Sequence, residues 1–74
     1  MRAYMVEMTI DDRSVQYKAV VAKDEAHARH YARQSGPAAL AVQVRKSLSA
    51  SEIRGLGLEG KPEGHVEPWT PQTP

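Results

Sequence analysis

The sequence predicts an α+β fold in which a three-stranded, mainly antiparallel sheet carries one packed helix in the order ββαβ. Two observations support this class. Apolar residues alternate by twos over residues 4–21 and 40–44, and they follow helical spacing over residues 24–35 between those stretches. A short helical turn and a disordered tail are expected after the last strand.

Residues 4–21 should form a hairpin of two strands. The first strand has one strongly apolar face, made of Tyr4, Val6, Met8 and Ile10. A polar turn at residues 11–14 leads into the second strand, whose alternating apolar set is Val15, Tyr17, Ala19 and Val21. We expect both sets to face the same core under the helix.

The helix should begin after Asp24 and end near Gln34. Asp24 is a good N-cap, and Glu25 behind it suits the positive end of the helix dipole. Serine, glycine and proline follow Gln34 and close the helix. Its apolar stripe consists of Ala28, Tyr31 and Ala32. The opposite side is a candidate partner-binding face, formed by Arg29, His30 and Arg33.

A third strand follows the helix, because Leu40, Val42 and Val44 alternate with other residues. Connections from strand through helix to strand are almost always right-handed, which places this strand parallel to the second. We favour the sheet order 2-1-3, with the first strand at the centre, because that strand is the most apolar on both faces. The order 1-2-3 stays open.

A short helical turn should begin after Ser49. Ser49 and Glu52 form a capping box, and Leu48 and Ile53 are placed as a hydrophobic staple. Two glycines then end the turn quickly. The leucines of this segment and Ile53 must be buried, and the sheet face that the long helix leaves open is the expected place.

That open sheet face is a second candidate partner-binding site, because it combines apolar anchors with a polar rim. The residues predicted for it are Met5, Lys18, Val20, Gln43 and Arg45. If the leucine-bearing segment covers this face, the site does not exist. If the segment leaves it open, the face can accept a target protein or a second copy of the chain as a homodimer.

Residues 59–74 contain four prolines, three glutamates and two glycines. We therefore expect a compact domain at residues 1–58 and a disordered, acidic tail at residues 59–74. In the tail, Pro68, Trp69 and Pro71 suit recognition as polyproline II, since prolines at every third residue share one edge of that helix. The alternative is a terminus without a role in recognition.

The composition limits the class of function. A chain of 74 residues with a net charge of +1 and no cysteine offers one small domain, no disulfide and no thiolate metal site. We expect no enzymatic activity, because so small a domain has little interior in which to desolvate a catalytic group. We also expect no cofactor, no membrane segment and cytoplasmic residence. His27 and His30 lie one helical turn apart, but zinc needs further ligands, so no metal site is predicted.

Nucleic-acid binding is the alternative function. Arg29 and Arg33 lie on one flank of the helix, and such a row of guanidinium groups can contact phosphates with release of counterions. Proteins that bind single strands also expose aromatic side chains for base stacking, whereas the tyrosines here are expected in the core. We therefore rank a weak, basic nucleic-acid-binding activity of the helix face below protein binding.

The passage from Val20 to Ala28, which leads from a hairpin into a helix, is similar to that in many unrelated small ββαβ proteins of bacteria and their phages. It identifies no family. Small proteins with this fold often inhibit or modulate a large assembly of the host. The comparison is an analogy from the fold alone. By that analogy we expect a small non-catalytic protein-binding module, a regulator or inhibitor of a bacterial transcription or defence machine.

Overall fold

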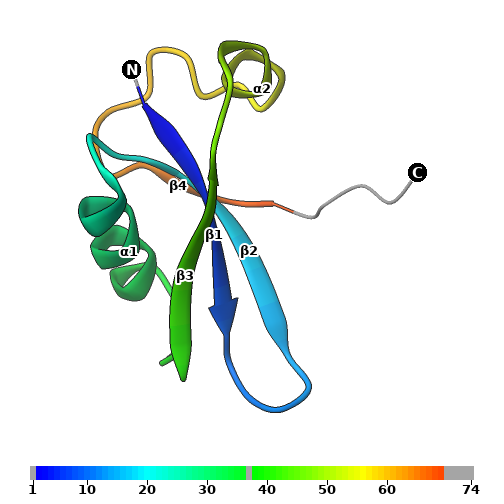
Figure 1. Cartoon of the computed structure of the whole chain (residues 1–74). Coiled ribbons are helices and arrows are strands. Elements are labelled where there is room, and N and C mark those ends of the chain that lie inside the picture. Colours follow the sequence, from blue (N-terminus) through cyan, green and yellow to red (C-terminus); the bar gives the residue numbers. More distant parts are fainter. Residues whose placement is uncertain (1, 37, 70–74) are drawn as a thin grey trace.

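The computed structural model describes residues 2–36 and 38–69, and it is an α+β fold with an antiparallel sheet and two helices. The helix α1 lies beside the sheet, and α2 lies at the end of the sheet away from the β1–β2 turn (Figure 1). The elements in chain order are β1 (Ala3–Thr9), β2 (Val15–Val21), α1 (Glu25–Gln34), β3 (Ala41–Ser47), α2 (Ala50–Gly55) and β4 (Val66–Pro68).

The sheet has four strands in the order β3-β1-β2-β4, and neighbouring strands are antiparallel. The predicted three-stranded sheet of order 2-1-3 is therefore wrong in the number of strands and in the full order. Within the observed sheet, β1 does lie between β2 and β3, as its apolar character on both faces suggested. The difference is β4, which pairs with the outer edge of β2 and comes from the segment predicted to be a disordered tail.

Backbone hydrogen bonds explain why this proline-rich segment is ordered. The Val21 N–H donates to the His65 carbonyl at 2.9 Å, the Gly64 N–H donates to the Val21 carbonyl at 2.8 Å, and the Trp69 N–H donates to the Tyr17 carbonyl at 2.9 Å. An open edge strand offers such partners to any chain that can extend beside it. The prediction of disorder is thus corrected for residues 59–69, because it weighed composition and ignored the free edge of β2.

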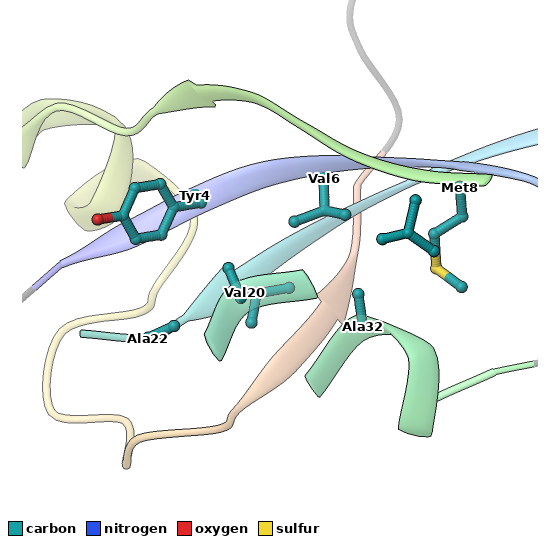
Figure 2. Close-up of a cluster of buried hydrophobic side chains, with 8 residues drawn as sticks. Tyr4, Val6, Met8, Val20, Ala22 and Ala32 are labelled. Carbon is teal, nitrogen blue, oxygen red and sulfur yellow. The ribbon is translucent and has the colours of Figure 1, made fainter. Parts of the chain in front are cut away.

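The first core lies between α1 and one face of the sheet. Figure 2 shows Val6 and Met8 pointing from β1 toward the helix, with Ala32 facing them. The small alanines on α1 allow the helix backbone to come close to the sheet. The buried members of this cluster are Tyr4, Val6, Met8, Val20, Ala22, Ala28, Ala32 and Val42.

The face of β2 that points toward α1 is the opposite of the one predicted. Tyr4 pairs directly with Val20, so Val20 points into the first core and is 0% exposed. The set that includes Tyr17 and Val21 therefore lies on the second face. Apolar residues occupy both faces at the end of β2, so alternation did not decide the register. The turn decided it, since Thr9 pairs with Val15 across the connecting residues.

The second core lies on the other face of the sheet, where α2 and its flanking leucines cover one end. The capping box of α2 is confirmed: the Glu52 N–H donates to Ser49 Oγ, and the Ser49 N–H donates to the Glu52 carboxylate. The buried members are Ala3, Ala19, Val21, Leu48, Ile53 and Leu58, with Met5, Leu56 and Trp69 packed against them.

Within the described part of the chain, no helix has the length and apolar character needed to span a membrane.

Candidate functional site

The candidate site is the half of the second sheet face that extends from α2 toward the β1–β2 turn. The apolar cluster under α2 extends along the sheet as far as Met5 and Ala19. Beyond it the sheet presents two cross-strand rows, Gln43–Glu7–Tyr17 and Ala41–Thr9–Val15. We call this surface the open half and define it by Glu7, Thr9, Val15, Tyr17, Gln43 and Arg45. It is mixed in polarity.

Val15 is the apolar centre of the open half that faces solvent. The residue is 47% exposed, which makes it one of two large apolar residues with such exposure in the described part of the chain. The second is Leu40, at the entry to β3. Single exposed apolar residues are common on monomeric proteins. Val15 is informative because Tyr17 and Thr9 adjoin it on the same face.

Glu7 organises the polar part of the open half. Its two carboxylate oxygens accept hydrogen bonds from Arg45 Nε and Nη2, each at 3.2 Å. The hydroxyl of Tyr17 donates to the same carboxylate at 3.3 Å. Glu7 is 16% exposed at its side chain and Arg45 is 50% exposed, so the carboxylate lies below the guanidinium and fixes its direction.

A β-bulge in β3 brings Arg45 to this position. Val6 pairs with Val44 and Met5 pairs with Lys46, which leaves Arg45 as the extra residue on β3. Such a bulge changes the direction of a side chain relative to a regular strand. The local irregularity therefore places a guanidinium beside the carboxylate of the central strand.

The structure separates the five residues that the sequence predicted for the open sheet face. Gln43 and Arg45 lie on the open half, and Met5 lies on the same face but packs under α2. Val20 is buried in the first core, and Lys18 pairs with Val6 and therefore points to the α1 side. The predicted positions of Val20 and Lys18 are therefore wrong, because the opposite face of β2 was expected to point toward α1.

The helix face lies on the outer side of α1. His30 and Arg33 are exposed, while Arg29 is half-buried. The His30 ring lies 5.8 Å from the Tyr31 ring, centroid to centroid, and the His27 ring lies 6.2 Å from it. Among residues 2–36 and 38–69, no cluster of three or more histidine, aspartate or glutamate side chains is arranged to hold a metal ion.

The predicted tail motif is divided by the structure. Pro68 ends β4 opposite Lys18, and Trp69 packs against the second core at its border with the open half. Pro71 lies outside the described residues. Pro68 and Trp69 thus take part in folding, and their predicted role in recognition stays a prediction.

Sequence reasoning missed Glu7, Tyr17 and Val15 as members of the site. A signal for Glu7 was present, because a carboxylate in the middle of an apolar strand needs a partner when the strand is central. Tyr17 and Val15 carried no such signal, since their alternation fits either face of β2. Only the register assigns them to the second face.

The N-cap of α1 gives a testable pH dependence. The pKa of Asp24 is lowered, first because its carboxylate accepts the backbone N–H of His27 at 2.8 Å and then because it bonds the His27 ring. A lowered pKa means that this cap stabilises the fold above the ordinary value of 3.8 and that the contribution is lost as pH falls through the folded-state pKa. We expect Asp24→Asn to flatten this part of the pH profile.

The measurement is the free energy of unfolding from about pH 6 down to about pH 2, where carboxylates titrate. Asp12→Asn, which removes an exposed carboxylate from the β1–β2 turn, is the matched control. A wild-type profile that matches the Asp24→Asn profile would show that the cap is not coupled to pH.

Comparison with known proteins assigns no family to the chain: no family model, no curated protein and no solved structure matches it.

Proposed function

We propose that this protein is a small, non-catalytic protein-binding module that uses the open half of its second sheet face to dock on a larger protein, where it acts as a regulator or inhibitor. The observation that carries the proposal is the exposed Val15 beside Tyr17 and a guanidinium fixed by Glu7. This combination provides an apolar anchor with polar groups around it.

The arrangement agrees with what is known of protein interfaces. Their centres are enriched in tyrosine and arginine, and their rims are polar. Ordering a long side chain on binding costs free energy, and Arg45 is already held by two hydrogen bonds. Net charge on the open half is near zero, because Arg45 and Glu7 compensate each other. Such a surface suits a protein partner better than a phosphate backbone.

The test compares two variants that change net charge by the same amount. Val15→Glu with Gln43→Glu alters the open half, and Arg29→Gln with Arg33→Gln alters the helix face; each pair lowers the net charge by two. The partner is captured from host lysate with the wild-type chain, identified by mass spectrometry and purified. We expect the open-half variant to bind it about tenfold more weakly or worse, and the helix-face variant to bind as the wild type does.

Circular dichroism and thermal unfolding are used to check that both variants fold. Loss of binding in the helix-face variant alone would contradict the proposal and favour α1. Capture of nucleic acid with a steep dependence on salt would contradict it in favour of the alternative function.

A further inference from the structure

A hollow of about 400 Å³ lies away from the open half, where three segments of the chain meet. The start of β1, the end of β2 and the connection between α2 and β4 run close to one another there (Figure 1). Backbone hydrogen bonds join them: the Ala22 N–H donates to the Arg2 carbonyl at 3.1 Å, and the Gly64 N–H donates to the Val21 carbonyl at 2.8 Å. The lining residues therefore project from a fixed backbone.

Three of the lining residues are cations that are far apart in the sequence. Arg2, Lys23 and Lys61 each come from a different segment, and all three line the same hollow. The ion pairs among the described residues engage Arg45, Lys46, Arg54 and two histidines, and none includes a cation of the hollow. The lining thus combines three cations with one carboxylate, Glu63, and a bound anion would relieve the repulsion among the cations.

One carboxylate also lines the hollow, and its hydrogen bonds show what it does. Glu63 accepts the backbone N–H of Lys23 at 3.1 Å and the hydroxyl of Tyr31 at 3.2 Å. Gly64 beside it lies under the Tyr31 ring, where an added Cβ would meet ring carbon at 3.4 Å. Glu63 therefore ties the connecting segment to β2 and α1, and the lining keeps an excess of positive charge.

We propose that this hollow binds the phosphate group of a small phosphorylated molecule. A phosphate carries one to two negative charges and several acceptor oxygens, so it matches a lining that contains three cations. The site is separate from the open half, which lies on the sheet between α2 and the β1–β2 turn. Its occupancy is therefore independent of the proposed docking of a protein there.

The test is to titrate the full chain with inorganic phosphate and with pyrophosphate at constant ionic strength. Binding is measured by the changes in amide NMR chemical shifts. We expect saturable shifts centred on Arg2, Lys23 and Lys61, with tighter binding of pyrophosphate. Lys61→Ala should weaken binding about threefold to tenfold. Glu63→Gln keeps an acceptor for Lys23 and Tyr31 but removes the negative charge, so it should strengthen binding.

Arg13→Ala is the matched control, since it removes one exposed cation from the β1–β2 turn and leaves the hollow intact. Equal weakening by Arg13→Ala and Lys61→Ala would overturn the proposal, because it would show a response to net charge alone. Shifts that do not saturate would also overturn it. A single-stranded oligonucleotide that binds more tightly than pyrophosphate and shifts Arg2, Lys23 and Lys61 would overturn the proposal of a small ligand in favour of nucleic acid.

Discussion

A chain that ends at residue 58 is expected to lose about 3 kcal/mol or more of its free energy of unfolding. The deletion removes β4, which bonds the outer edge of β2, and it removes Val66 from the first core and Trp69 from the second. A domain of this size has a total stability of roughly 4–11 kcal/mol, so the loss would leave it largely unfolded or close to unfolding. Chemical denaturation followed by circular dichroism measures the effect.

A single substitution in β4 shows whether the lost stability comes from β4 itself or from the shortening of the chain. Val66→Asp places a charge where Val66 packs beside the first core, and it should destabilise the full chain in the same direction. Glu59→Ser, which changes an exposed residue of the same segment, should leave the stability within about 0.5 kcal/mol of wild type. A truncated chain with wild-type stability would contradict the four-stranded sheet.

Val20→Asp is the substitution with the largest expected effect, a loss of about 4 kcal/mol or more. Val20 is 0% exposed between β1 and α1, and no described cation lies in that apolar cluster to pair with a carboxylate. The charge would have to be desolvated or the core opened. Gln43→Asp, a matched control on the exposed face of β3, should change stability by less than about 1 kcal/mol.

Denaturant unfolding of the two variants measures the difference. The comparison is informative because both positions have apolar residues on either side in the sequence. Equal stability of the Val20→Asp and Gln43→Asp chains would mean that β2 presents Val20 to solvent, and the observed register would be wrong.

The sequence predicted the local elements well where one signal dominated. Asp24 caps α1 and Ser49 with Glu52 caps α2, because side-chain capping depends on residues within one turn. The alanine stripe of α1 likewise follows from helical spacing alone. The α+β class came from periodicity, and the central place of β1 between β2 and β3 came from its apolar residues on both faces.

What the sequence did not determine depends on pairing between distant segments. The face of β2 depends on the turn that joins it to β1, since a shift of one residue moves every side chain to the other face. The fourth strand depends on a free edge that composition does not report. The Glu7–Arg45 pair depends on a bulge in β3, which has no marker in the sequence.

The candidate site was accordingly predicted only in part. Gln43 and Arg45 were placed correctly on the second face, while Tyr17 and Val15 were assigned to the first core. The error had a functional consequence. It removed the aromatic and apolar members from the surface on which the proposed function now rests.

Site-specific photo-crosslinking shows whether the open half is the docking surface. A benzophenone amino acid replaces Val15, Gln43 or, on the outer side of α1, Arg33, and each chain is irradiated in host lysate. Positions 15 and 43 are expected to crosslink to the same protein, and position 33 is not. A crosslink to that protein from position 33 alone, with none from the open half, would contradict that expectation.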